Sequence, residues 1–179
     1  MYGLVHRGIK EFLLHSASPE AWNRIRTQAG IADDEFEDLR AYPDEETFAL
    51  VGAVSQELGQ PPEDILYAFG RNWVLFTAES AYGDLLEQAG DTFESVILNL
   101  DMLHQIVGRS MPDLRPPTFD VKDVKDGWIV EYHSERVGLE SMVAGLLEGL
   151  LEMFGKKGMI QRLPAASYCE VQFLVTLTT

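Results

Sequence analysis

The stretch from Thr92 to Arg136 reads TFESVILNLDMLHQIVGRSMPDLRPPTFDVKDVKDGWIVEYHSER, and its pattern changes from helix to strand at Pro112. Before that proline, residues 92–109 carry apolar side chains at helical spacing. After it, the Lys-Asp-Gly sequence at 125–127 is a hairpin turn signal between two strand-like runs, the second from Trp128 to Arg136. The stretch therefore predicts one long helix followed by an antiparallel hairpin.

The remainder of the chain extends this pattern in both directions. Proline and acid pairs at 19–20, 43–44 and 62–63 are typical helix starts, and the run from 168 to 177 has the composition of a strand. Strands with an inserted helix after a helical block indicate an α+β fold. Helices are expected at residues 4–15, 18–30, 43–54, 61–73, 81–89 and 138–154.

Composition limits the class of protein. A chain of 179 residues suits one domain, and no apolar run approaches the roughly 18 residues of a membrane span. Its 29 acidic and 14 basic residues give a formal net charge of −15, which disfavours nucleic acid and anionic membranes as partners. The single cysteine, Cys169, excludes an intrachain disulfide and a zinc site built from several cysteines. With no signal peptide at the first residues, we expect a cytoplasmic protein whose partners are proteins or a buried small molecule.

His104 is the first residue with possible chemistry. Ile97, Leu100 and Val107 lie seven and four residues before it and three after it, so one long helix would place all of them on its face. Such a histidine is either a hydrogen-bonded core residue or a ligand to a metal such as iron. Asp101 would lie on an adjacent face, and no second ligand shares the face of His104. A metal here must bring its other ligands, as haem does.

A second group comprises Tyr132, Ser134 and Arg136. On an extended strand these alternate residues would share one face and spread hydrogen-bond donors over about 13 Å. That row suits a ligand with two neighbouring carboxylates, and the alternative is an exposed strand face. Trp128 and Val130 on the same face indicate that it is partly buried.

Taken in order, Leu100-Asp101-Met102-Leu103-His104, then Pro116-Pro117, then Tyr-x-Ser-x-Arg at 132–136 resemble the haem-nitric oxide/oxygen-binding (H-NOX) domain family. That family includes the haem domain of soluble guanylate cyclase and stand-alone bacterial sensors. The resemblance covers nearly the whole chain. It implies a helical subdomain at about 1–62 and a helix-plus-sheet subdomain at about 63–179, with haem b between them.

The resemblance also assigns roles to residues. It implies that His104 is the proximal iron ligand and that Tyr132, Ser134 and Arg136 bind the haem propionates. Asp44 matches an acid that pairs with the motif arginine in relatives; alternatively, it is an acid favoured at a helix N-terminus. Pro117, Leu100 and Leu103 would make apolar contacts with the porphyrin. Pro117 would also distort it from planarity.

The distal positions bear on which gas binds. Relatives that hold oxygen have a distal tyrosine, whereas this chain has Met142 at the matching position, or Ser141 if the short turn aligns one residue differently. The other distal positions are apolar apart from the indole donor of Trp73: Leu4 or Val5, Ile9 and Trp73. We therefore expect nitric oxide and carbon monoxide to bind and oxygen to be excluded. Ordinary core packing is the alternative for these side chains.

An output domain is not visible in the sequence, so the resemblance implies a separate signalling partner, such as a histidine kinase or a cyclic-di-nucleotide enzyme. No glycine-rich phosphate loop, nucleophile elbow or paired acidic motif appears, so we expect a protein that is not an enzyme. Three alternatives remain: an enzyme using His104 with Asp101, a haem-free interaction domain, and an oxygen-binding haem protein.

Overall fold

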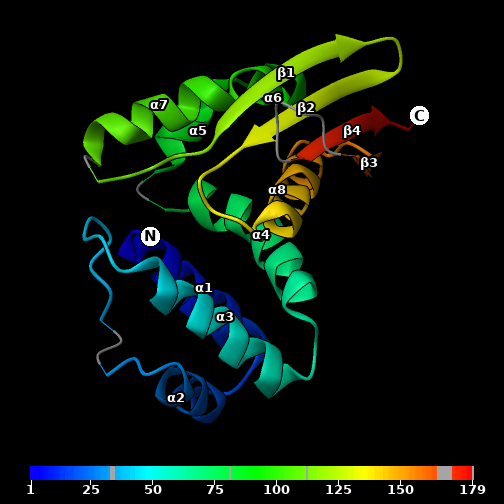
Figure 1. Cartoon of the computed structure of the whole chain (residues 1–179). Coiled ribbons are helices and arrows are strands. Elements are labelled where there is room, and N and C mark those ends of the chain that lie inside the picture. The colour runs from blue at the N-terminus through cyan, green and yellow to red at the C-terminus, as the bar shows by residue number, and fades with distance from the viewer. Residues whose placement is uncertain (33–34, 81, 112, 165–170, 179) are drawn as a thin grey trace. The chain divides into compact units, whose positions relative to one another are not determined.

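A computed structural model describes residues 1–32, 35–80, 82–111, 113–164 and 171–178 (Figure 1). It divides the chain into two compact units, residues 1–69 (unit 1) and 70–179 (unit 2), with the division inside helix α4. The elements are α1 (Gly3–Ser16), α2 (Pro19–Gln28), α3 (Asp44–Leu58), α4 (Pro62–Ala78), α5 (Gly83–Ala89), α6 (Phe93–Leu98), α7 (Leu100–Ser110), β1 (Thr118–Val124), β2 (Gly127–His133), α8 (Glu140–Met153), β3 (Gly158–Leu163) and β4 (Val171–Leu177).

Unit 1 is helical, and local signals define its helix ends. The Ser18 hydroxyl accepts a hydrogen bond from the backbone N–H of Ala21 (3.3 Å), and Pro19 follows in the first turn of α2. Gly30, just beyond that helix, has φ of 75°, a left-handed conformation that glycine adopts without strain. The fully buried core of the unit comprises Leu13, Ile25, Leu50 and Val54.

A histidine is buried inside unit 1. His6 is fully buried on α1, and its Nε2 lies 2.7 Å from the hydroxyl of buried Thr47 on α3. The rings of Phe36 and Tyr42 lie 5.0 and 5.2 Å from the imidazole. Its Nδ1 has no hydrogen-bond partner among the residues that the structure describes. This burial lowers the pKa of His6 from its usual 6.5 to about 4, because a charged imidazole would lose its hydration there.

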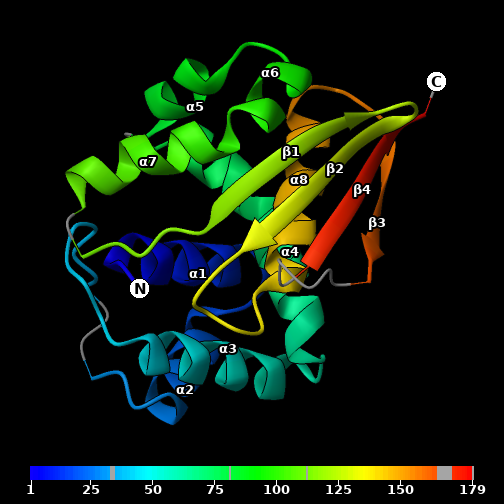
Figure 2. The same cartoon turned by 45° about the horizontal axis from the view of Figure 1, so that its top comes forward.

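Unit 2 contains a four-stranded antiparallel sheet in the order β1-β2-β4-β3 (Figure 2). Inward side chains of the sheet, among them Val130, Phe173 and Val175, share a core with Val143 and Leu147 of α8. The expected hairpin between β1 and β2 is present, with Val124 paired to Gly127. The α+β class is confirmed.

Strand β3 was not expected. Its sequence, GMIQRL, places apolar residues at Met159, Ile160 and Leu163, without the alternation that marks a half-buried strand. Pairing with β4 makes it a strand, since Gly158 to Leu163 match Leu177 to Gln172 residue by residue.

The expectation of one helix over 92–109 is wrong. The segment forms two helices, α6 and α7, separated at Asn99, which has φ of −102° and ψ of 10°. The Asn99 side-chain amide donates to the carbonyl of Ala89 (2.8 Å), a bond that ties the break to the end of α5. Ile97 therefore belongs to a different helix from His104. Of the three residues predicted to share a helix face with His104, only Leu100 and Val107 are on the same helix.

The other expected helices are present, with ends that differ by a few residues from the expected ones. The predicted last strand is β4, and residues 168–170 of that prediction, Cys169 included, lie outside the described residues. No helix in the described part of the chain is long and apolar enough to cross a membrane.

Two glycines allow α8 to pack closely against the part of α4 that belongs to unit 2. A Cβ added to Gly70 would lie 2.1 Å from the carbonyl oxygen of Met142. A Cβ added to Gly149 would lie 2.4 Å from the carbonyl oxygen of Arg71. Since both neighbours are backbone atoms, any side chain at either position would force the helices apart.

We predict that His6 makes stability depend on pH. Because its folded pKa lies below the unfolded value, the unfolded chain binds the proton more readily between pH 6.5 and 4. The contribution of His6 to the free energy of unfolding is therefore fully present above pH 6.5. It falls by up to about 3 kcal/mol as the pH drops through this window. His6→Gln, which can keep the bond to Thr47 but does not titrate, should remove this part of the dependence in urea unfolding measured at pH 7 and pH 4.5.

His15→Gln is the matched control, because His15 is exposed on the same helix. It should leave the pH dependence unchanged. Equal pH dependence in His6→Gln and the parent protein would contradict the assignment.

Candidate functional site

The imidazole of His104 is held by its own helix. Its Nδ1 lies 2.8 Å from the backbone carbonyl oxygen of Leu100, one turn earlier in α7. A carbonyl can only accept, so Nδ1 must carry the proton and donate it. The neutral ring then has its lone pair on Nε2, which makes no hydrogen bond within the described residues. A histidine fixed in this tautomer is suited to bind a metal through Nε2.

The environment of His104 favours that neutral form. Burial lowers the pKa of His104, outweighing the opposing effects of the Leu100 hydrogen bond and the nearby Asp101 carboxylate. The ring of Phe119 lies 5.1 Å from the imidazole, and the ring of Tyr132 lies 5.6 Å beyond it. An aromatic series thus leads from His104 across β1 to β2.

Asp101 does not orient His104. One of its carboxylate oxygens accepts the backbone N–H of Phe119 (3.2 Å), and the other accepts the side-chain amide of Gln105 (2.7 Å). The first bond ties α7 to the start of β1. This engagement weakens the alternative in which Asp101 and His104 act together as a catalytic pair, because the imidazole proton already goes to Leu100.

The predicted row of Tyr132, Ser134 and Arg136 on one strand is only partly correct. Tyr132 lies on β2, is 2% exposed and belongs to the core cluster with Val130, as the partly buried face predicted. The strand ends at His133. The Ser134 hydroxyl then accepts the backbone N–H of Arg136 (3.0 Å), which closes a local turn that replaces the extended chain.

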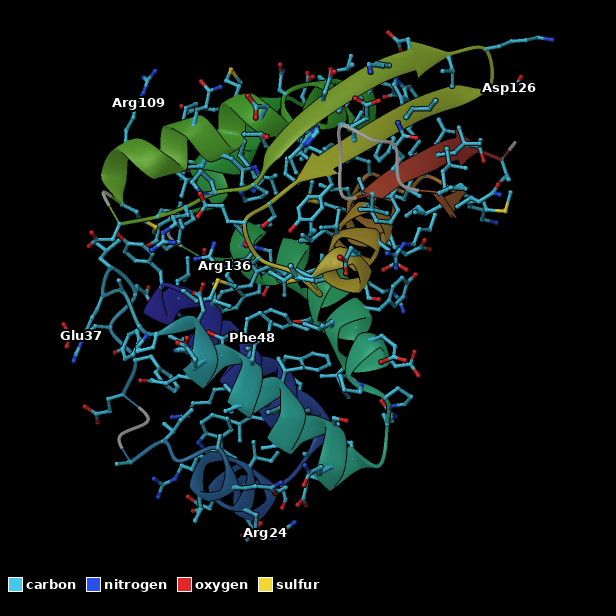
Figure 3. All side chains as sticks on the ribbon, in the orientation of Figure 1. Arg24, Glu37, Phe48, Arg109, Asp126 and Arg136 are labelled. Atoms are coloured by element: carbon cyan, nitrogen blue, oxygen red, sulfur yellow. The ribbon has the colours of Figure 1, made fainter. Side chains whose placement is uncertain are left out.

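Arg136 lies on the segment between β2 and α8, where Figure 3 labels it. Its guanidinium donates to the backbone carbonyl of Arg115 (2.7 Å), on the loop that precedes β1. The guanidinium of Arg115 in turn forms an ion pair with the carboxylate of Glu135, with 3.3 Å between the nitrogen and the oxygen. These contacts join the end of β2 to the loop that carries Pro117, which is half-buried.

The two leucines assigned to the cofactor precede His104 on α7. Leu100 is buried, and Leu103 is half-buried and packs against the core of unit 2. Phe119 was expected only as a strand residue. No local pattern marks it as a neighbour of His104, since the contact joins residues 15 positions apart and depends on how β1 packs on α7.

The predicted distal residues belong to both units. In unit 2, Met142 is half-buried on α8, next to Ser141, and the ring of Trp73 on α4 lies 5.3 Å from that of Phe76. In unit 1, Leu4 and Ile9 are buried on α1, and Val5 is half-buried. Their grouping around one ligand stays a prediction.

Asp44 lies in the first turn of α3, as the helix-terminus alternative expects, and accepts a hydrogen bond from the Met1 nitrogen (2.5 Å). Its predicted pair with Arg136 joins residues of different units and stays a prediction. Within the described residues, no group of three or more His, Cys, Asp or Glu side chains could hold a metal ion.

Solved structures with the same fold are H-NOX proteins. An H-NOX protein from S. oneidensis in the Fe(II) ligation state superposes with a TM-score of 0.89 at 21% identity, covering 100% of this chain and 97% of that one. The Fe(II)NO state of an S. oneidensis H-NOX protein gives 0.88 at 21% identity, with 100% of both chains covered. At these identities the likeness concerns the fold.

Sequence relatives include cyclases. Soluble guanylate cyclase gcy-33 of Caenorhabditis elegans is 30% identical over 155 residues, which is 86% of this chain and 16% of that protein. Guanylate cyclase soluble subunit beta-2 of Rattus norvegicus is 33% identical over 93 residues, 51% of this chain and 14% of that protein. The chain thus spans about one sixth of the length of these relatives.

The Haem-NO-binding family model matches residues 2–162. The family match, the relatives and the fold agree with the family that the sequence resembles. The chain belongs to the Haem-NO-binding (H-NOX) family of haem-binding gas-sensor domains.

Proposed function

We propose that this chain binds haem b with His104 as the iron ligand and acts as a sensor of nitric oxide. The observation that carries the proposal is the tautomer of His104. Its Nδ1–H is committed to the Leu100 carbonyl, so Nε2 offers a lone pair, and burial favours the neutral ring by lowering the pKa of His104. Family membership supports the cofactor.

The donors in unit 2 fit haem. A porphyrin supplies four ring nitrogens and two carboxylates, so it needs one further ligand and cationic or hydroxyl partners from the protein. His104 would supply the ligand, while Tyr132, Ser134 and Arg136 would hold the carboxylates. Apolar contact would come from Pro117, Leu100 and Leu103. When bound, haem supplies a ferrous iron that binds diatomic gases.

Helix α7 is suited to pass on a change at His104. The histidine is hydrogen-bonded within α7, and Asp101 of the same helix is bonded to the backbone of Phe119 on β1. A displacement of the imidazole would therefore act on α7 and on the first strand of the sheet together. A switch needs two such states and a ligand that favours one of them.

The distal residues support selectivity for nitric oxide and carbon monoxide over oxygen. Met142, or Ser141 if the short turn aligns one residue differently, stands at the position of the tyrosine whose hydroxyl would stabilise bound oxygen in relatives. Leu4 and Ile9 add only apolar surface. The indole N–H of Trp73 favours the alternative, an oxygen-binding protein, because it is a hydrogen-bond donor. A haem-free interaction domain is the other candidate.

We predict that His104→Gly removes the strong Soret absorption of the purified protein. Added imidazole should restore it, because free imidazole can replace the missing ligand. His15→Gly is the matched control, since His15 is an exposed helical histidine in unit 1, and it should keep the spectrum. A colourless parent protein that takes up no added haem would reject the proposal in favour of the haem-free alternative.

We predict that the reduced protein has the same absorption spectrum in air as under nitrogen, at times before oxidation, while nitric oxide and carbon monoxide each change it. Met142→Tyr should introduce sensitivity to air by adding a hydroxyl donor. Met142→Phe is the control, with the same ring and no hydroxyl. An oxygen-dependent spectrum in the parent protein would show that the distal argument is wrong.

We further propose that residues 1–179 form one sensor domain, not itself an enzyme, with a helical subdomain at about 1–62 and a proximal subdomain at about 63–179. It would signal in the cytoplasm, a location that the single cysteine supports. Its partner would be a separate histidine kinase or cyclic-di-nucleotide enzyme. Neither nucleic acid nor a membrane is expected as a partner, given the net charge of −15.

The signalling proposal predicts that nitric oxide changes the partner's activity when this protein is present and has no effect when it is absent. His104→Gly should remove the response, because the iron ligand is lost. Identical partner activity with and without the gas would overturn the signalling proposal and leave the haem spectrum as an independent result.

A further inference from the structure

Strand β3 lies at one edge of the sheet. In the order β1-β2-β4-β3 it has one strand neighbour, β4. Figure 2 shows it beside β4, at the margin opposite the β1–β2 hairpin. Met159 on this strand is 57% exposed, and Gln161 and Arg162 are exposed as well.

The register shows which backbone groups of β3 point outward. Just before the strand, the N–H of Thr178 donates to the carbonyl of Lys157 (2.8 Å). Because hydrogen-bonded and non-bonded pairs alternate in an antiparallel ladder, Met159, Gln161 and Leu163 bond to β4. The N–H and C=O groups of Gly158, Ile160 and Arg162 then face away from β4. Within the described residues, none of these three has a hydrogen bond on that side.

The side chains along this edge are basic, in contrast with the rest of the chain. Residues 153–169 contain no aspartate or glutamate, although the whole chain has 29. Lys156 is paired with Glu94 at 3.4 Å. Lys157 and Arg162 are exposed and have no ion pair among the described residues. Two unpaired cations thus flank the open backbone groups.

The other edge strand, β1, differs in both respects. Its register makes Phe119 an outward-facing residue, and the Phe119 N–H is already taken by the Asp101 carboxylate. β1 and the turn after it also carry three acids, Asp120, Asp123 and Asp126, against two lysines, of which Lys122 is already paired with Glu131. An incoming acidic strand would therefore be less favoured at β1 than at β3.

We propose that the β3 edge, residues 157–162, binds an extended acidic segment of a partner protein, which adds to the sheet as a fifth strand. Main-chain hydrogen bonds to Gly158, Ile160 and Arg162 would provide affinity, and Lys157 and Arg162 would select acidic side chains. These two cations are five residues apart, or about 16 Å along a strand. The matching segment carries acids five residues apart with alternating apolar residues between them. This inference does not depend on the proposed gas-sensing function.

A second copy of this chain is a poorer occupant. Two β3 strands related by a twofold axis would bring Lys157 and Arg162 of one copy close to the same cations of the other, and like charges on paired strands are destabilising. Charged residues on an edge can also serve only to prevent self-pairing. Under that alternative, no extended segment binds here.

The test uses the haem-loaded full chain and two synthetic peptides with blocked ends. Glu-Thr-Val-Thr-Val-Glu has acids at the required spacing, and Lys-Thr-Val-Thr-Val-Lys reverses the charge. We expect the acidic peptide to bind, with an affinity that falls as salt is added, and the basic peptide not to bind, as measured by fluorescence anisotropy. Amide exchange should slow at Gly158, Ile160 and Arg162 when the acidic peptide is present.

Variants locate the site. The double variant Lys157→Glu/Arg162→Glu should lower the affinity for the acidic peptide at least tenfold and should bind the basic peptide. Lys125→Glu is the control for charge, because Lys125 lies in the turn between β1 and β2, two strands that do not pair with β3. Replacing the first valine of the acidic peptide by proline should abolish binding if main-chain hydrogen bonds contribute.

Binding that the β3 variant leaves unchanged would overturn the proposal, as would slowed exchange at β1 instead of β3. Absence of binding by either peptide would favour an edge that only prevents self-pairing. Association of the protein with itself through β3, detected by a concentration-dependent mass, would assign the edge to a second copy. The Soret spectrum is recorded for every variant, so a failure of haem binding is distinguished from a failure of this inference.

Discussion

The hydrogen bond from His104 Nδ1 to the Leu100 carbonyl is the constraint on which the proposed site depends. It uses a backbone group that the helix itself supplies, one turn before the histidine. It fixes the tautomer, and burial lowers the pKa of His104, which disfavours the uptake of a second proton. A neutral imidazole with one free nitrogen is what a single-ligand metal site requires. Without that bond, the ring could rotate and present either nitrogen.

The surroundings of His104 make this local arrangement part of a larger one. Asp101 ties α7 to β1 through the Phe119 backbone, and the Phe119 ring lies between His104 and Tyr132. The break at Asn99 gives α7 a direction independent of α6. The helix with the histidine is therefore anchored at its first turn to the sheet, and the sheet carries the start of the predicted carboxylate-binding group.

The strand register in unit 2 also decides which backbone groups face outward at the two edges of the sheet. The alternation that turns the N–H of Phe119 toward Asp101 on β1 turns Gly158, Ile160 and Arg162 outward on β3. On β1 the outward N–H of Phe119 is bonded to a carboxylate of the protein itself, whereas the outward groups of β3 have no partner among the described residues and lie beside basic side chains. Edge strands of opposite charge give the sheet two different surfaces, although both belong to one ladder.

The sequence by itself determined the α+β class, most helix starts and the β1–β2 hairpin, and it singled out His104 as the candidate ligand. These depend on local signals: Pro19 and Ser18 at a helix start, the turn at 125–127, and an ordered motif. Only the tertiary structure decided the break at Asn99, the turn at Ser134, the strand β3 and the position of Phe119 beside His104. Each of these depends on a partner distant along the chain or on a side-chain bond that competes with regular structure, and residue periodicity carries no information about either.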